Sequence, residues 1–366
     1  MGCSCGKKDV KQQEFDQVGL VNNHAYSVLS VNTIDDQCLI YLRNPWGHDV
    51  WNGDWSFDWS GWTDEYKEAL NYEQMQWNEG TFWMPFEMFL YYFDYISIAR
   101  LRTAQNWQDL RFSINLGFHC DCKMLKMVVR EPTEICLELF QQSERHMDAE
   151  VDIAILVHKV KSGTNRPGEL VFRSSRKHAG NICTNEKFFE SGEYLVCWLS
   201  LNYIHNGRTV PGTIVVHSSK LVIASLIDSS MEILRDSLIS LILKEGQTQE
   251  LYPNLIYYSM GEKFRGMMAL VENTDNSNAA EITLDYRESK NVISTRGDLY
   301  TKDLLQPGHR QILTILTPIK PMDQLLYSVK SKVKQIDRSK VPNESNIPPL
   351  ESAALMALHG SVSLFD

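Results

Sequence analysis

The chain reads HAYSVLSV at 24–31, CLIYLR at 38–43 and NPW at 44–46, and this stretch decides the fold of its first part. The first two runs have the length and pattern of β-strands, and the polar residues between them predict a turn. We therefore expect an antiparallel hairpin. Because the start of one strand lies beside the end of its partner, this hairpin brings His24 close to Asn44.

A histidine beside an asparagine is the arrangement that holds the general base of a thiol protease. Such a site needs a thiolate, an imidazole that shares its proton, and an amide that fixes the imidazole tautomer. Asn44 can accept the ring N–H of His24 without adding a charge, and Trp46 can cover that hydrogen bond. His24 and Asn44 are thus candidate catalytic residues, with Trp46 as their shield. On these residue types alone the ordinary alternative is favoured, in which His24 only begins a strand and Asn44-Pro45 only makes a turn.

Tryptophan is concentrated just beyond this hairpin. Such a density predicts a rigid aromatic surface, which we interpret mostly as core and cleft wall. Residues 85–93 then predict a short amphipathic helix, and residues 96–101 a closing strand. The tryptophans of this region are Trp46, Trp51, Trp55, Trp59, Trp62, Trp77 and Trp83.

The rest of the chain predicts a mainly β protein of the α+β class. After residue 104, short strand-like runs follow one another about every ten to twenty residues, separated by polar and glycine-containing turns. In residues 133–140 apolar residues alternate with glutamates, which indicates a sheet with one face in water. The runs fit two antiparallel β-sandwiches, over 105–228 and 229–331. The strand candidates are 123–130, 133–141, 151–160, 193–199, 213–227, 255–260, 266–272, 281–286, 291–295 and 311–317.

The segments between and after the sandwiches have other patterns. Residues 231–243 predict a helix or a strand. Residues 332–350 are rich in Lys, Ser, Asn and Pro, which predicts a flexible linker. The apolar residues 350–364 predict a short terminal helix that docks on the protein, so 332–366 is expected to be a linker and docking tail.

Composition restricts the partners and the compartment. The length of 366 residues predicts two or three domains, and the formal charge of −10 argues against a nucleic-acid partner. The 8 cysteines are unevenly spaced, which fits free thiols in a reducing compartment and predicts a cytoplasmic protein. No uncharged apolar run approaches the roughly 20 residues that span a bilayer.

Residues 19–28 and 43–47, followed by GDWS at 53–56 and GTFWM at 80–84, resemble the second half of the calpain protease core. This resemblance implies that residues 1–104 are the His/Asn side of a papain-like core, followed by a C2-like sandwich. It implies limited proteolysis of intracellular proteins by a Cys/His/Asn site, with calcium dependence in many members. Further motifs are similar to the small optic lobes (SOL) branch, at 47–48, 62–63, 92–94, Trp107, 191–194, 216–222, 291–297, 309–313 and 358–360.

The chain departs from the family at the nucleophile. The resemblance places the nucleophilic cysteine in a half-core that precedes Met1, and Cys3 and Cys5 lack the sequence context of that nucleophile. Losing the nucleophile costs about a million-fold in kcat in a comparable serine enzyme, so we expect this chain alone to be inactive. The alternative is a non-catalytic scaffold or regulatory protein whose sandwiches bind protein or membrane partners.

Calcium is the only cofactor that the resemblance suggests, and its site looks degraded. Calcium takes about six to eight oxygen ligands, yet most of the matching positions lack a carboxylate. Nearby aspartates could substitute, although solvated loop acids are the simpler interpretation. We therefore assign no metal-binding residue. The matching positions are Val50, Phe57, Glu79 and Thr81, and the nearby acids are Asp49, Asp54 and Asp58.

Three weaker signals concern zinc and lipid. Residues 119–122 (HCDC), with Cys3 and Cys5, have C-x-C spacing that structural zinc sites do not favour, so free cysteines are preferred. Gly2 and Cys3 resemble a lipidation start, but Gly6 stands where that motif prefers Ser or Thr. A basic cluster could bind an anionic lipid head, although such residues are usually only solvated. The expected partners are thus protein substrates or the nucleophile half-core, with membrane lipid a weak third. The basic cluster is Arg166, Arg173, Arg176, Lys177 and His178.

Overall fold

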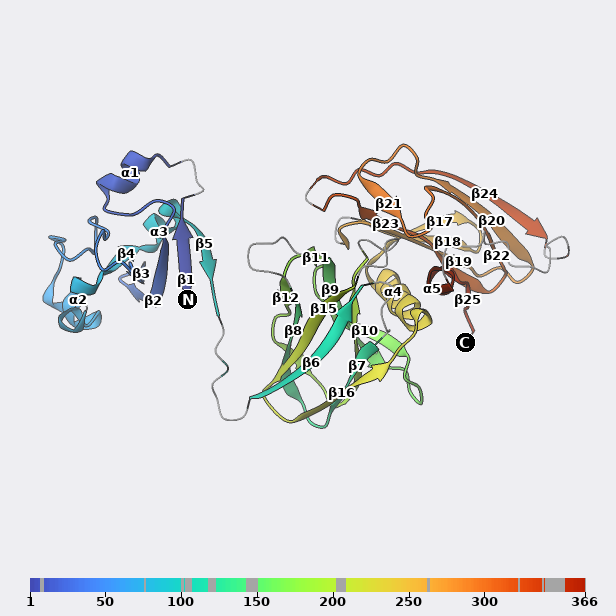
Figure 1. The fold of residues 1–366 in the computed structure, drawn as a ribbon, viewed down its shortest axis with the longest axis horizontal. Coiled ribbons are helices and arrows are strands. Elements are labelled where there is room, and N and C mark those ends of the chain that lie inside the picture. The colour runs from blue at the N-terminus through green and yellow to red at the C-terminus, as the bar shows by residue number, and fades with distance from the viewer. Residues whose placement is uncertain are drawn as a thin grey trace. The chain divides into compact units, whose positions relative to one another are not determined.

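The computed structural model is mainly β, with several antiparallel sheets, and it divides into two compact units, Met1–Thr103 and Ala104–Asp366 (Figure 1). It describes residues 1–6, 10–75, 77–99, 102, 107–117, 123–142, 151–201, 209–261, 264–321, 323–337, 339 and 353–365. Within these residues no helix is both long and apolar enough to cross a membrane.

The first unit is built on a five-stranded antiparallel sheet in the order β4-β3-β2-β1-β5. The predicted hairpin is confirmed, because β2 pairs with β3 and Ser27 lies opposite Arg43. The strands are β1 (Gly2–Cys5), β2 (Ala25–Ile34), β3 (Gln37–Arg43), β4 (Thr81–Pro85) and β5 (Phe93–Ser97). The helices are α1 (Gln12–Gln17), α2 (Asp64–Ala69), α3 (Phe86–Tyr92) and the 3₁₀ turns η1 (Tyr72–Gln74) and η2 (Trp77–Glu79).

The closing strand lies earlier than predicted. We expected it at residues 96–101, but β5 spans Phe93–Ser97 and follows α3 without a loop. Its partner is β1, in which Cys5 lies opposite Phe93 and Gly2 lies opposite Ser97. The strand therefore begins and ends where this short partner offers hydrogen bonds, which the apolar pattern of a single segment does not reveal.

The tryptophan-rich loops of the first unit form a separate aromatic core. The indole of Trp55 lies 4.6 Å from that of Trp59 and 5.4 Å from that of Trp62, measured between ring centroids. Trp55 and Trp83 are almost fully buried. These side chains pack against Leu39 and Leu70, so this part of the predicted aromatic surface is core rather than open cleft.

The first sandwich of the second unit has two antiparallel sheets, β10-β9-β14-β7-β16 and β12-β8-β15-β6. Their inner faces share one apolar core, to which β8 contributes the alternating residues Ile135, Leu137 and Leu139. The strands are β6 (Gln108–Leu116), β7 (Lys123–Val129), β8 (Thr133–Gln141), β9 (Asp152–Val160), β10 (Pro167–Arg173), β11 (Lys177–His178), β12 (Asn181–Cys183), β13 (Lys187–Phe189), β14 (Gly192–Leu199), β15 (Val210–Ser218) and β16 (Val222–Asp228).

The single strand expected over residues 213–227 is two strands. β15 pairs with β6 and β8, whereas β16 pairs with β7 in the opposite sheet. The chain turns between them, where Ser219 N–H donates to Glu134 O at 3.0 Å and Val222 N–H donates to Gln108 Oε1 at 2.9 Å. This turn moves the chain from one sheet to the other. Because the residues on both sides of the turn are mostly apolar, the sequence pattern alone predicted one continuous strand.

The second sandwich pairs the sheet β17-β18-β19-β23-β21 with the sheet β22-β20-β24. Residues 332–337, expected to begin a linker, belong instead to β24, which places Val333 opposite Ile282 of β20. Residues 340–350 of that expected linker lie outside the described residues. The strands are β17 (Gln247–Tyr252), β18 (Leu255–Met260), β19 (Met267–Asn273), β20 (Asn278–Asp285), β21 (Val292–Ser294), β22 (Tyr300–Leu305), β23 (His309–Pro318), β24 (Lys330–Asp337) and β25 (Val362–Ser363).

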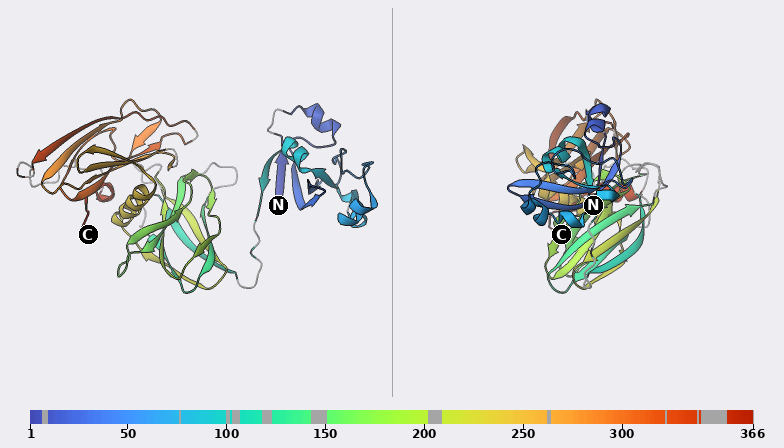
Figure 2. Two further views of the ribbon diagram at one scale, coloured as in Figure 1. Left: turned by 180° about the vertical axis from the view of Figure 1, so that it is seen from behind. Right: turned by 90° about the vertical axis from the view of Figure 1, so that its left-hand side faces the viewer.

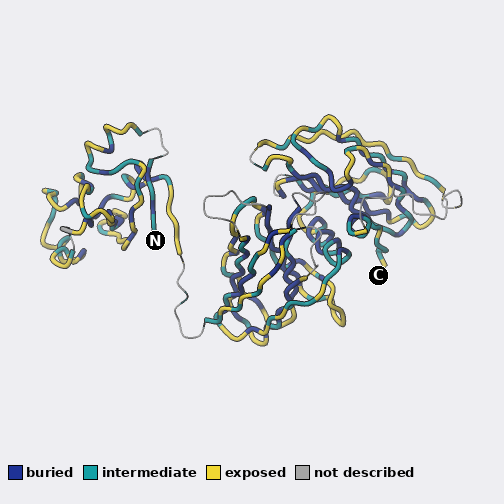
Figure 3. The backbone as a smooth tube through the Cα atoms, in the orientation of Figure 1, coloured by how far each residue is buried: buried dark blue, intermediate teal, exposed yellow. Residues whose placement is uncertain are grey.

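A third apolar core lies between the two sandwiches, around the helix α4 (Met231–Glu245) and the terminal helix α5 (Ala353–His359) (Figures 1 and 2). Residues 231–243, expected as a helix or a strand, are therefore helical. Buried residues lie on most sides of α4, as expected for a helix covered by protein on more than one face. Figure 3 shows this as a largely buried stretch of backbone. The expected terminal helix is present, with Leu355 and Leu358 in this core.

Candidate active site

His24 and Asn44 lie at adjacent strand ends of the first unit. His24 directly precedes β2 and Asn44 directly follows β3. The backbone of Asn44 is held on its other side by the residue that precedes β4, because Asn44 N–H donates to Gly80 O at 2.8 Å. Backbone hydrogen bonds of the sheet therefore place His24 and Asn44 next to each other, independently of their side chains.

The side chains of His24 and Asn44 meet in a hydrogen bond. The distance from His24 Nε2 to Asn44 Oδ1 is 2.8 Å. The amide of Asn44 is fully buried, and its Nδ2 donates to His48 O at 2.5 Å and to Asp49 O at 3.0 Å. Because two carbonyls face the amide nitrogen, the amide oxygen must face the imidazole. That oxygen only accepts, so Nε2 carries the proton and Nδ1 of the neutral ring is left as a base.

Trp46 covers one side of this pair. Its indole lies 4.1 Å from the imidazole of His24 between centroids, at an interplanar angle of 40°. Its backbone N–H also donates to Asn44 Oδ1 at 3.0 Å. The side chain is 56% exposed, so it presents an apolar surface while screening the hydrogen bond from water. The structure thus brings together all three residues that the sequence singled out.

Tyr26 is a neighbour that the sequence analysis missed. Its ring lies edge-on to the imidazole of His24 at 5.1 Å, and its hydroxyl accepts a hydrogen bond from Val21 N–H at 2.8 Å. Tyr26 is buried, and it stands two residues after His24, on the same side of the extended chain. This two-residue spacing from His24 is the sequence feature that could have identified Tyr26 as a neighbour of the imidazole.

Gly80 is a second missed position, because it allows the close approach of the Asn44 loop. Its φ is +82°, and a Cβ there would lie 2.7 Å from Asn44 O and 2.8 Å from Gly47 Cα. Gly47 has nearly the same φ of +81°, but a Cβ at that position meets nothing within 4 Å. A side chain at either position would therefore adopt the same unfavourable backbone conformation. Only a side chain at position 80 would also clash with the backbone of Asn44 and Gly47.

We expect Gly80→Ala to destabilise the first unit more than Gly47→Ala does. Both variants incur the left-handed backbone cost of roughly 1–2 kcal/mol, and only Gly80→Ala also displaces the Asn44 backbone. Urea unfolding followed by tryptophan fluorescence reports the first unit, which holds most of the tryptophans. Equal midpoints for the two variants would show that the close approach at Gly80 is unimportant.

Cys3 and Cys5 are poor candidates for a nucleophile. Both side chains are buried in β1, and Cys5 Sγ donates to Val21 O at 3.0 Å. Burial raises the pKa of the Cys3 thiol to about 12 and also raises the pKa of the Cys5 thiol. A nucleophilic cysteine needs the opposite shift, because the thiolate is the reactive form. These thiols are therefore part of the core.

The residues at the expected calcium positions do not fit a calcium site. Glu79 pairs with Arg43 at 3.3 Å, Thr81 is buried, and Asp49 Oδ2 lies 2.7 Å from His48 Nδ1. In the described part of the first unit, no group of three or more potential ligands gathers around a common point. The described acids of this unit therefore do not gather into a cluster of carboxylates of the kind that contributes to the roughly six to eight oxygen ligands of calcium.

The two remaining sequence candidates lie in the second unit. Residues 119–122, considered for zinc, lie outside the described residues. In the basic cluster, Arg176 is buried and pairs with Asp152 at 2.9 Å, while Arg173 pairs with Glu245 at 2.8 Å. These two arginines thus form ion pairs within the second unit. The Arg176 guanidinium also lies 4.8 Å from the centroid of the Phe264 ring.

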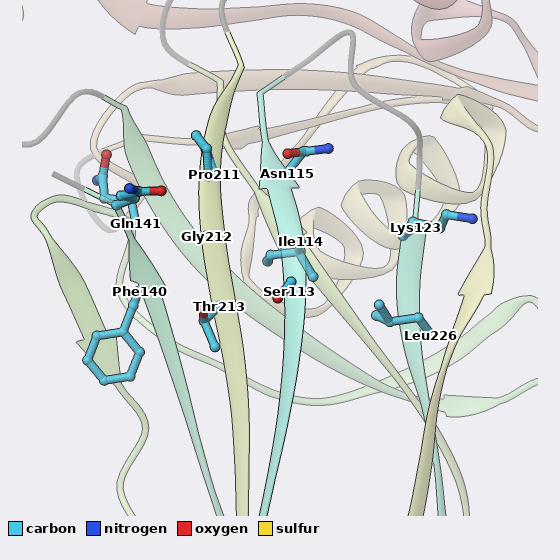
Figure 4. Close-up of a pocket in the computed structure, with 11 residues that line it drawn as sticks. Ser113, Ile114, Asn115, Lys123, Phe140, Gln141, Pro211, Gly212, Thr213 and Leu226 are labelled. Atoms are coloured by element: carbon cyan, nitrogen blue, oxygen red, sulfur yellow. The ribbon is translucent and has the colours of Figure 1, made fainter.

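A pocket of about 530 Å³ opens in the first sandwich between strands of both sheets. Figure 4 shows its side chains along β6, β8 and β15, with Lys123 and Leu226 on the opposite side. Among its described lining residues the charged side chain is Lys123, which forms an ion pair with Asp228. The hydroxyls of Ser113 and Thr213 also line the pocket, but the described lining holds no histidine or carboxylate that could activate them.

Two family models match parts of the chain. Residues 1–100 match the calpain family cysteine protease model, and residues 241–340 match the calpain-D-like C-terminal domain. The first unit is thus similar in sequence to the calpain family protease domain, and the matched residues include His24 and Asn44. The second match runs from the end of α4 into the second sandwich.

Curated relatives match a similar share of the chain. The calpain-type cysteine protease DEK1 of Arabidopsis thaliana is 40% identical over 98 residues, which are 26% of this chain and 4% of that protein. Calpain-5 of Caenorhabditis elegans is 38% identical over 112 residues, covering 24% of this chain and 17% of the relative. Calpain-9 of Rattus norvegicus is 33% identical over 123 residues, which cover 30% of this chain and 18% of the relative. The chain therefore spans only a small part of the relatives that it matches.

Proposed function

We propose that this chain, whose first unit matches the calpain protease domain, supplies the base and the orienting amide of a calpain-type cysteine endopeptidase. His24 is the general base and then the general acid, Asn44 is its orienter, and Trp46 is the shield. The observation that carries the proposal is the 2.8 Å hydrogen bond from His24 Nε2 to Asn44 Oδ1, with the amide held by two carbonyls.

In this reaction Nδ1 of His24 takes the proton of a cysteine thiol, and the resulting thiolate attacks the peptide carbonyl. The imidazolium then returns the proton to the leaving amine, and a water molecule hydrolyses the thioester with His24 again acting as base. Asn44 keeps the ring in the required tautomer and orientation throughout. Trp46 limits access of water to the hydrogen bond between His24 and Asn44.

The nucleophile comes from the other half-core of the calpain-type site, so residues 1–366 alone are inactive. The family resemblance supports this part of the proposal, since it places the nucleophilic cysteine in the half-core opposite the one that carries the histidine and the asparagine. The burial of Cys3 and Cys5 also supports it. The substrates are proteins, because calpain-type sites cleave polypeptides at a cleft between the two half-cores.

Within the family we assign the chain to the SOL branch, with a C2-like first sandwich and a cytoplasmic location. The match of residues 241–340 to the calpain-D-like C-terminal domain supports the branch, together with the motifs quoted from the sequence. The free cysteines of the described residues fit a reducing compartment. Any calcium dependence arises outside the His24–Asn44 region, because the residues there do not fit the ion.

The test is reconstitution. The full chain is co-expressed with the nucleophile half-core of a calpain, and hydrolysis of a fluorogenic peptide is measured together with labelling by a thiol-directed protease probe. We expect activity and labelling of the added cysteine only when both parts are present. A folded complex without activity would contradict the proposal, and so would probe labelling of this chain alone that disappears in His24→Ala.

A second candidate function is a non-catalytic partner-binding protein. It is favoured by apolar side chains that the first unit leaves in water, among them Val31, which is 62% exposed, and Tyr95, which is 64% exposed. Surfaces of this kind commonly bind another protein. If the reconstituted complex forms but shows neither hydrolysis of the peptide nor labelling by the probe, this second function is the better account.

A further inference from the structure

A second cluster of reactive side chains lies on the first sandwich, on the face of β8 opposite its apolar core, with Cys136 itself fully buried. Cys136 and Glu138 stand two residues apart on β8, so both project to the face opposite Ile135 and Leu137. Across the sheet, Cys183 of β12 lies opposite Glu138. On the other side, His217 of β15 lies opposite Cys136. Three strands thus bring two thiols, a carboxylate and an imidazole to one face.

The ligand atoms converge on a small volume. Cys136 Sγ lies 3.4 Å from Cys183 Sγ, and Cys183 Sγ lies 3.4 Å from Glu138 Oε1. The two sulfurs and a carboxylate oxygen are all within 4.8 Å of one another, the one such group in the described part of the chain. His217 Nε2 lies 3.7 Å from Glu138 Oε1.

These distances match a tetrahedral zinc site more closely than a disulfide. A disulfide needs a sulfur–sulfur distance of about 2.05 Å. Zinc–sulfur bonds of about 2.3 Å and zinc–oxygen bonds of about 2.0 Å give tetrahedral edges of roughly 3.8 Å between sulfurs and roughly 3.5 Å between sulfur and oxygen. The observed 3.4 Å spacings need only a few tenths of an ångström of movement to reach those edges.

The hydrogen bonding of the cluster is also compatible with a bound cation. Without one, both thiols act as donors to a single carbonyl, Thr184 O, at 3.0 Å from Cys136 Sγ and 3.2 Å from Cys183 Sγ. A divalent ion that prefers thiolate ligands would replace this shared contact, and its binding would release the two thiol protons.

We propose that Cys136, Cys183 and Glu138 bind one zinc ion, with water in the fourth position and His217 orienting the Glu138 carboxylate. Cys183 is exposed, which leaves room for the water. The ion joins β12, a strand of three residues, to the central part of β8. This site is independent of the proposed protease function, because it uses only the second unit.

The experiment is an anaerobic titration of the full chain with Co²⁺, a spectroscopic substitute for zinc, followed by displacement with Zn²⁺. The protein carries Cys120→Ser and Cys122→Ser, so that those thiols cannot contribute. We expect thiolate-to-cobalt absorption at one equivalent, lost in Cys183→Ser, whose exposed side chain can change without disturbing the core. His217→Gln, which removes the orienting side chain, should weaken binding about 10–100-fold. Glu138→Gln, which replaces a ligand, should weaken binding at least as much.

Cys38→Ser serves as the matched control, because Cys38 is also exposed but lies in the first unit. It should leave the absorption unchanged. The proposal is overturned if cobalt binds without thiolate absorption or not at all. It is equally overturned if Cys183→Ser binds as well as the parent protein, or if Cys136 and Cys183 form a disulfide in the presence of reductant.

Discussion

Replacing His24 with alanine in the reconstituted protease should lower kcat by as much as about a million-fold, the loss measured when the histidine of a comparable hydrolase is removed. The reason is that Nδ1 of His24 is the group that both takes and returns the proton. Hydrolysis of the fluorogenic peptide measures the loss. Binding of the nucleophile half-core should persist, because His24 is only partly buried and precedes β2 rather than lying within it.

His48→Ala is the matched control. His48 also lies beside Trp46, with 6.1 Å between ring centroids, but its Nδ1 pairs with Asp49 Oδ2 at 2.7 Å. Its hydrogen bond with Asn44 comes from the backbone, because its carbonyl accepts from Asn44 Nδ2, and alanine at this position keeps that carbonyl. Its removal should leave most of the activity. A similar loss in both variants would mean that packing around Trp46, and not proton transfer by His24, limits the rate.

Replacing Asp303 with alanine should destabilise the second sandwich by about 3–5 kcal/mol, the usual cost of leaving one member of a buried ion pair without its partner. Arg296 Nη1 lies 2.9 Å from Asp303 Oδ1, and both side chains are almost fully buried. The same oxygen accepts from Gln311 Nε2 at 3.1 Å. Hydrogen exchange in β22 and β23 under increasing urea reports this sandwich separately from the tryptophan-rich first unit.

A second Arg–Asp pair in the same sandwich provides the comparison. Arg287 Nη2 lies 2.7 Å from Asp285 Oδ2, but the arginine side chain is 64% exposed. Water can solvate Arg287 after Asp285→Ala. This variant should therefore change the hydrogen exchange of the second sandwich much less than Asp303→Ala does. If both substitutions have the same effect, burial of the Arg296–Asp303 pair is not what stabilises the sandwich.

The sequence predicted the candidate site better than the surrounding fold. His24, Asn44 and Trp46 could be placed together because a single hairpin connects them, so their distance depends on local register alone. Tyr26 and Gly80 were missed for different reasons. Tyr26 looked like an ordinary strand residue, and the need for glycine at 80 depends on the approach of a separate segment.

The errors in the fold have a common physical cause. The apolar residues of α4 face two sandwiches at once, so their pattern has no single polar face and did not distinguish a helix from a strand. Residues 332–337 looked polar because β24 is an edge strand with most side chains in water. The Cys136–Cys183 contact joins strands far apart in the chain, and spacing within the sequence gives no sign of it.

The most direct test of the account is the protonation state of the His24 ring, because the proposed role requires Asn44 to hold the Nε2–H tautomer. Nitrogen-15 NMR of the imidazoles in the full chain distinguishes the two tautomers of each neutral histidine. We predict that neutral His24 carries its proton on Nε2, and that Asn44→Ala allows a mixture of both forms. A proton on Nδ1 of His24, or a spectrum unchanged by Asn44→Ala, would contradict the claim that Asn44 prepares His24 as a base.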